Sequence, residues 1–231
     1  MSSRDTILNR LRQGRTAAAV ATVASPLPAG LLDADPVERF IERARALDSS
    51  VERLASLAGL PAAVAAYLDS HQLPRRLVCW PQWAGLDWAA AGVEVEARPA
   101  RGDDLVGLTG CFAALAETGT LMLLSGPATA AVTSLLPETH LAVVPASRIV
   151  TTLEQAFALL RSERGEPPRA VNLVSGPSRT GDIEQTITLG AHGPYRVRIW
   201  VVEDESEDTA SEHSASEHSA SEYTASEYTT R

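Results

Sequence analysis

The stretch LVGLTGCFAALAETGTLMLL, Leu105 to Leu124, holds two short apolar runs separated by residues that favour turns. Similar runs recur along the chain, and several are nearly continuous in apolar residues, as strands covered on both faces are. They are Leu77 to Trp80, Val93 to Ala97, Leu105 to Leu108, Leu121 to Leu124, Leu141 to Val144, Ala170 to Val174 and Val197 to Val202. This pattern predicts the strands of a sheet.

Helical patterns precede these runs and alternate with them. Asp35-Pro36 is a typical helix start, and an apolar stripe follows it as far as Leu47. Further helices are expected at Pro61 to His71, Leu86 to Ala91, Ala128 to Leu135 and Leu153 to Ser162. The alternation predicts an α/β fold with a mostly parallel sheet and helices on both faces.

We expect one folded domain with a simpler segment on each side. Residues 1–34 form a short helix that begins near Ser3 and an Ala/Pro-rich linker, and residues 35–203 form the α/β domain. Residues 204–231 repeat a five-residue unit, as in Ser214-Ala-Ser-Glu-His218. This acidic tail has too little apolar content to offset the entropy of ordering, so we expect it to be disordered.

The charge of the chain limits its functions. The net charge is −9, but nine of the 29 acidic residues lie from Glu203 onward beside a single base, Arg231. The domain is therefore nearly neutral, which argues against nucleic acid as a partner. All 20 basic residues are arginine. Without lysine on this chain, Schiff-base catalysis, pyridoxal phosphate attachment and a Walker-type phosphate loop are excluded.

Cysteine usage and hydropathy argue against metal sites and membrane spans. The two cysteines, Cys79 and Cys111, belong to no C-x-x-C pair, so we expect neither a disulfide nor an iron–sulfur or zinc site, and no cofactor on this chain. No window approaches the roughly 18 apolar residues of a membrane span, and the first residues are charged instead of apolar. We expect a cytoplasmic protein.

A first group of site candidates surrounds the break between two of the predicted strands. In the turn Glu117-Thr118-Gly119-Thr120, amide donors and two hydroxyls can converge beside one carboxylate, which suits an anionic or polyhydroxylated ligand. Thr109 and Gly110, at the end of the preceding run, belong to the same group. The alternative is a plain hairpin with an exposed glutamate.

A second group is the loop from Gly176 to Glu184. Two glycines permit close backbone approach, two hydroxyls can donate, and an arginine can bind a carboxylate or phosphate with two hydrogen bonds. In order, the candidates are Gly176, Ser178, Arg179, Thr180, Gly181, Asp182 and Glu184. A helix that starts at Asp182 would add a partial positive charge. The alternative is an ordinary helix cap with a solvated arginine.

Three further features are weaker candidates. His192, before Gly193-Pro194, is either a turn residue or a proton shuttle. Ser134 to His140 is interpreted as a helix end that enters a strand. Three tryptophans lie close together in sequence: Trp80, Trp83 and Trp88. They are interpreted either as the lining of a pocket or, as is more common for aromatic residues at such spacing, as part of the core.

Taken together and in order, several motifs between Leu108 and Val202 resemble the LUD-domain family, in particular its lactate-utilisation members. They are Leu108-Thr-Gly110, Ala116-Glu-Thr-Gly-Thr-Leu121, Ser134-Leu-Leu-Pro137, His140, Gly176 to Glu184 and Gly190-Ala-His-Gly-Pro194. The resemblance implies a three-layer α/β fold like that of the sugar-phosphate isomerase, CoA-transferase and formyltetrahydrofolate cyclo-ligase superfamily. It also implies a bacterial protein that works with one cysteine-rich and one iron–sulfur partner in oxidising L-lactate to pyruvate.

Three functional hypotheses follow. In the first, the chain is a subunit of a lactate-oxidising assembly, and Glu117, Arg179, Asp182, Glu184 and His192 bind a small carboxylate or phosphate, or a partner. In the second, the chain is a stand-alone transferase, isomerase or ligase that binds a small anion, with Glu117 as nucleophile or base and His192 as proton shuttle. In the third, it is a regulatory scaffold.

Overall fold

The computed structural model describes residues 3–14, 35–183 and 186–203. The chain divides into two compact units, Met1–Leu31 and Leu32–Arg231. In the first unit, the helix expected near Ser3 is α1, Ser3–Gly14. The expected linker and the acidic tail lie outside the described residues. Among the described residues, no helix is long and apolar enough to cross a membrane.

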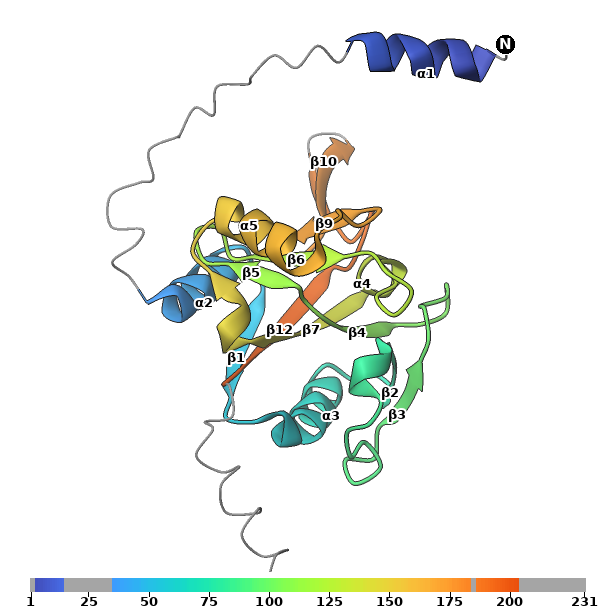
Figure 1. Ribbon diagram of the computed structural model, residues 1–231. Helices are drawn as coiled ribbons and strands as arrows, with labels where there is room; N and C mark the ends of the chain where they lie inside the picture. Colours follow the sequence, from blue (N-terminus) through green and yellow to red (C-terminus); the bar gives the residue numbers. More distant parts are fainter. Residues whose placement is uncertain (1–2, 15–34, 184–185, 204–231) are drawn as a thin grey trace, which may run out of the picture. The chain divides into compact units, whose positions relative to one another are not determined.

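The second unit is built around a six-stranded sheet in which every neighbouring pair is parallel. Its order is β1 (Ser50–Leu54), β12 (Arg196–Val202), β7 (Thr139–Pro145), β4 (Val106–Gly110), β2 (Arg76–Cys79) and β3 (Glu94–Ala97). The central strands β4 and β7 are buried almost throughout, as their continuous apolar sequences predicted. The mostly parallel α/β fold is confirmed (Figure 1).

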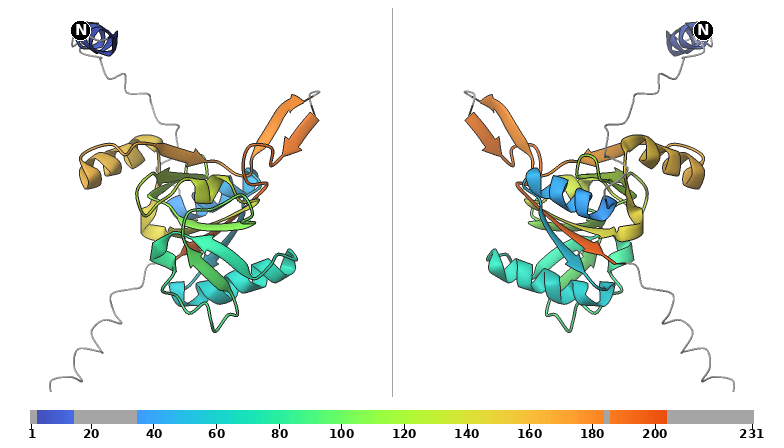
Figure 2. Two further views of the ribbon diagram at one scale, coloured as in Figure 1. Left: turned by 90° about the vertical axis from the view of Figure 1, so that its right-hand side faces the viewer. Right: turned by 90° about the vertical axis from the view of Figure 1, so that its left-hand side faces the viewer.

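A smaller four-stranded sheet, which the sequence did not separate from the first, lies on one side of the large sheet. Its order is β8 (Ile149–Val150), β5 (Ala113–Leu115), β6 (Thr120–Leu124) and β9 (Val171–Val174). The β5–β8 pair is parallel and the other two pairs are antiparallel. A separate hairpin, β10 (Arg179–Ile183) and β11 (Thr186–Leu189), extends away from both sheets (Figure 2).

Strand β6 shows how the layers are stacked. Leu121 and Leu123 belong to the large core cluster, whereas Met122 and Leu124 belong to a second cluster with Ala156 and Leu160 of helix α5 (Leu153–Arg164). Because alternate residues of a strand point to opposite faces, the small sheet lies between the large core and α5. Figure 1 shows α5 over β5 and β6.

Helix α2 (Pro36–Ala46) begins where the sequence predicted. The Asp35 carboxylate accepts a hydrogen bond from Val37 N at 2.9 Å, and Pro36 occupies the first turn. Phe40, Ile41 and Ala44 are buried in the large core. The apolar stripe of α2 thus anchors it to the domain.

Helix α3 (Leu60–Ser70) covers the sheet face opposite α2 and the small sheet (Figure 1). Tyr67 on α3 meets Trp200 on β12 edge to face, with ring centroids 6.0 Å apart. Three 3₁₀ turns complete the described elements: η1 (Leu57–Gly59), η2 (Pro81–Trp83) and η3 (Ala146–Arg148).

Two of the predicted helices are wrong or shortened. Residues 86–91 form turns, in which Ala90 N donates to the Asp87 carboxylate at 3.1 Å, so a local side-chain bond replaces a helical one. From Ala128 to Leu135 only α4 (Val132–Leu135) is helical, because Thr129 Oγ1 donates to Leu124 O at 2.7 Å and holds the preceding segment as a loop.

Candidate ligand-binding cavity

A cavity of about 510 Å³ opens at the carboxyl ends of β2, β4 and β7. Trp80 follows β2, Gly110 ends β4, and Val143 and Pro145 belong to the end of β7. Open α/β sheets bind their ligands at this edge, because the loops that leave parallel strands converge there. The location alone makes the cavity a candidate ligand site.

One wall of the cavity is aromatic. Trp80 and Trp83 belong to the large core but also line the cavity, so both readings of these residues hold. Trp80 Nε1 donates to Ala130 O at 3.1 Å, which fixes the orientation of its indole ring. The Trp83 indole N–H is buried and has no hydrogen-bond partner among the described residues. Gln82 adds an amide beside the two indoles.

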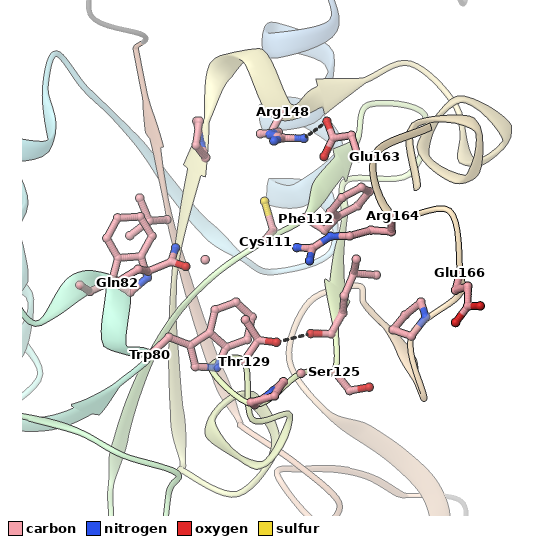
Figure 3. A pocket seen from close by; sticks show the side chains of 18 residues that line it. Trp80, Gln82, Cys111, Phe112, Ser125, Thr129, Arg148, Glu163, Arg164 and Glu166 are labelled. Carbon is pink, nitrogen blue, oxygen red and sulfur yellow. Dashed lines mark hydrogen bonds and ion pairs between the residues drawn. The ribbon is translucent and has the colours of Figure 1, made fainter. Parts of the chain in front are cut away.

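Two arginines line the other side. Arg148 lies over the ring of Phe112, 5.6 Å from its centroid, and forms an ion pair with Glu163 at 2.7 Å. Arg164, the last residue of α5, has no ion-pair partner among the described residues. In Figure 3 its side chain extends past Phe112 toward the interior, while Glu166 lies at the far edge.

A thiol lines the cavity, in the two-residue link between β4 and β5. Cys111 is partly exposed, whereas Cys79 is buried. Burial raises the pKa of Cys111 to about 12 and that of Cys79 to about 11. Both side chains are therefore neutral thiols at pH 7, and Cys111 contributes a small polarisable surface to the cavity.

The predicted Glu117 turn is a hairpin between β5 and β6. Glu117 Oε1 accepts from Leu153 N at 2.8 Å, at the first residue of α5, while Thr118 is exposed. Gly119 has φ +68°, and a Cβ there would lie 2.3 Å from Ala44 N of α2. The carboxylate and the glycine therefore join this turn to two helices of the same chain.

The predicted loop meets that turn. Thr120 Oγ1 and Ser175 Oγ are hydrogen-bonded at 2.7 Å, and a Cβ on Gly176 would lie 2.2 Å from Leu47 O. Arg179 forms an ion pair with Asp48, the residue after Leu47. The two predicted segments are thus neighbours, and both pack at the carboxyl end of α2.

The remaining part of the loop differs from the prediction. Gly181 and Asp182 lie in strand β10, so the expected helix start at Asp182 is wrong, and Glu184 lies outside the described residues. The backbone amide of Ser178 donates to Pro194 O at 2.7 Å, and Thr180 pairs with Thr188 of β11. A hairpin replaces the helix because this backbone is satisfied by cross-strand bonds.

His192 is exposed, and no hydrogen bond links it to Glu117 in the part of the chain that the structure describes. Of the predicted site residues that the structure describes, Gly110 lines the cavity and the others do not. Thr109 is fully buried, and its Oγ1 lies 2.8 Å from His140 Nε2. Burial lowers the pKa of His140 to about 4, and its Nδ1 has no partner among the described residues.

No group of three or more His, Cys, Asp or Glu side chains is placed to hold a metal ion within residues 3–14, 35–183 and 186–203. The family model of the LUD domain matches residues 82–202, which is just over half of the chain. The chain belongs to the LUD-domain family. The resemblance inferred from the motifs is confirmed.

Named relatives of this LUD-domain chain are lactate utilisation proteins. It is 40% identical over 121 residues to "Lactate utilization protein C 1" of Bacillus mycoides, covering 51% of each chain. It is 37% identical over 131 residues to "Lactate utilization protein C" of Bacillus licheniformis, covering 54% of each. The chain spans about half the length of the curated relatives it matches.

A solved structure extends the likeness of the LUD domain to three dimensions. A DUF162 family protein from Deinococcus radiodurans, known from a crystal structure, has a TM-score of 0.54 and 26% identity to this chain. The alignment covers 77% of this chain and 99% of that one. The fold therefore extends well beyond the region that the family model matches.

The arginines of the cavity were missed at the level of sequence. Arg148 follows β7 and Arg164 ends α5, so neither belongs to a glycine-rich motif. A usable signal did exist, because Trp80, Gly110 and Pro145 all lie where a predicted apolar run ends. Collecting the residues after each parallel strand would have located the cavity of this LUD domain.

Proposed function

We propose that this LUD-domain chain is a ligand-binding subunit of a cytoplasmic assembly that oxidises L-lactate to pyruvate. The observation that carries the proposal is the family match together with the names of the relatives. Residues 82–202 include every residue that lines the cavity except Trp80. The region shared with the family is therefore the region that builds the candidate ligand site.

Electron transfer is assigned to the partners. The chain has two cysteines, whereas a [4Fe–4S] cluster is held by four thiolates. Both thiols have raised pKa values, which disfavours the thiolate that binds iron. We assign the clusters to an iron–sulfur partner and a cysteine-rich partner, and no cofactor of this kind to this chain.

The partner-binding surface is assigned to the base of the β10–β11 hairpin. Leu135 at the end of α4 is 44% exposed, Leu136 after it is 48% exposed, and Leu189 of β11 is 53% exposed. A Cβ on Gly193, next to exposed His192, would lie 3.8 Å from Leu135 O, so α4 and this loop are neighbours. Exposed apolar side chains rimmed by polar ones are typical of protein interfaces. The predicted site residues Ser178, Arg179, Thr180 and His192 then act at this interface.

The proposal is tested by deleting the gene in its host and measuring growth on L-lactate as sole carbon source. We expect growth to fail, to be restored by the full chain, and the tagged chain to co-purify with an iron–sulfur protein. Leu136→Glu should abolish co-purification, whereas Ser162→Glu, which adds the same charge to an exposed position of α5, should not. Normal growth of the deletion strain would overturn the proposal.

The cavity also supports a second candidate, a stand-alone transferase, isomerase or ligase that binds a small anion. The observation in its favour is the position of the cavity at the carboxyl edge of the parallel sheet. The structure of Glu117 argues against this candidate, because its Oε1 already accepts a hydrogen bond from Leu153 N of α5. A thermal-shift screen of the purified chain with nucleotides, CoA esters and sugar phosphates tests it. If the chain is instead a regulatory scaffold, none of these ligands should raise its melting temperature.

A further inference from the structure

The cavity has room for a ligand larger than lactate or pyruvate. Even at the ~30 Å³ that one molecule of liquid water occupies, the six non-hydrogen atoms of lactate fill about 180 Å³. That is about a third of the 510 Å³ available. Cavities of about 300 to 1,000 Å³ are typical of sites that bury most of the surface of a drug-sized ligand. The volume therefore favours a ligand the size of a mononucleotide.

The aromatic wall of the cavity indicates a planar ring as one part of such a ligand. Trp80, Trp83 and Phe112 are at least nine-tenths buried, and the parts of their rings that line the cavity are apolar, which suits contact with a planar ring. The Gln82 amide supplies polar groups beside the indoles, and the buried Trp83 N–H has no partner among the described residues. A planar ring that carries heteroatoms uses both kinds of surface.

The arginines specify the other part. Glu163 neutralises Arg148, but Arg164 keeps its charge without an ion-pair partner among the described residues. Its guanidinium can donate two parallel hydrogen bonds to a phosphate or a carboxylate. Figure 3 shows Arg164 reaching from α5 into the cavity, with Trp80 and Gln82 on the other side.

We infer that this cavity binds a planar heteroaromatic ring joined to an oxyanion, a ligand of mononucleotide size, with the ring on the tryptophan wall and the oxyanion on Arg164. This ligand is additional to lactate, so the inference goes beyond the proposed function. Phosphate and carboxylate are the two possible sources of the oxyanion. The ring chemistry is shared by both.

The test is titration calorimetry on the full-length chain, with tryptophan fluorescence as a second readout. The probes are AMP and FMN, which carry a heteroaromatic ring and a phosphate; adenosine, which lacks the phosphate; inorganic phosphate, which lacks the ring; indole-3-lactate, which carries a heteroaromatic ring and a carboxylate; and L-lactate. We expect AMP, FMN or indole-3-lactate to bind at least tenfold more tightly than adenosine, phosphate and L-lactate. If the phosphate probes bind more tightly than the carboxylate probe, the oxyanion is a phosphate, and in the opposite case it is a carboxylate.

Arg164→Ala should weaken the tightest probe by ten- to a hundredfold and leave adenosine unchanged, since a charged hydrogen bond is lost. Arg161→Ala, one turn earlier on α5 and outside the cavity lining, should change nothing. Both residues are exposed, so both variants should fold, and a melting curve checks this.

Equal binding of phosphate and AMP, equal effects of the two arginine variants, or no saturable binding of any probe would each overturn the inference. Growth on lactate is a separate readout. A chain that supports growth but binds none of the probes keeps the proposed function and loses this inference.

Discussion

Glycine-containing turns occur both at the cavity and at the carboxyl end of α2, but they serve different purposes there. We call the contacts of Gly119 and Gly176 with α2 and Leu47 the glycine junction. There, another part of the same chain approaches the glycine backbone closely, whereas at the cavity the space is open and Arg164 has no ion-pair partner among the described residues. A glycine-rich turn indicates that another group approaches the backbone closely. The sequence alone does not distinguish a ligand from a helix of the same chain.

Substitution of Gly176 by alanine should break the junction. The new Cβ would lie 2.2 Å from Leu47 O, and the residue has φ +79°. Backbone strain and overpacking together should lower the free energy of unfolding by about 3 kcal/mol or more. Urea denaturation measures this.

Gly165→Ala is the matched control for that variant. Gly165 also has a positive φ, +67°, but a Cβ there meets nothing within 4 Å. Only backbone strain should act in this variant, and it should lower the free energy of unfolding by about 1–3 kcal/mol. Equal losses in the two variants would show that the contact with Leu47 contributes nothing.

Stability should also fall at acidic pH because of His140. Its pKa is about 4 in the folded protein, against an ordinary value of 6.5. The unfolded chain therefore takes up a proton that the folded chain refuses, so stability is full above pH 6.5 and is lost as pH falls toward 4. The loss over this window should be about 3 kcal/mol.

Urea midpoints of the natural chain and of His140→Gln between pH 7.5 and 4.5 test this effect. The glutamine variant should show a flatter dependence on pH. Carboxylates such as Asp104, whose pKa the hydrogen bond from Arg98 lowers from an ordinary 3.8, act below this window. Parallel curves for the two proteins would rule out His140 as the titrating group.

Most of the fold was readable from the sequence, and most of the cavity was not. Apolar runs such as Leu141 to Val144 and the Asp35-Pro36 start report local preferences and burial, so β7 and α2 were predicted. The strand β1, Ser50–Leu54, was missed because three of its five residues are charged or polar and only Val51 is buried. Arg148 and Arg164 come together only through the packing of η3 and α5, which no local pattern encodes.

Glu117 tests whether the predicted turn is structural. Glu117→Ala removes the acceptor for Leu153 N at the start of α5 and should lower the free energy of unfolding by about 1 kcal/mol. Glu117→Gln keeps an acceptor oxygen and should cost less. Both variants should support growth on lactate. Loss of growth with the glutamine variant, at normal stability, would instead make the carboxylate a functional group.

The smallest effect on stability is expected at Arg179. Its side chain is 46% exposed and that of its partner Asp48 is 66% exposed, so solvent screens their ion pair. Arg179→Ala should change the free energy of unfolding by less than about 0.5 kcal/mol. If the hairpin base is the partner surface, the same variant should still weaken co-purification, whereas Asp48→Ala should not. Equal loss of partner binding in both variants would mean that the ion pair orders the surface, and retention in both would remove Arg179 from the interface.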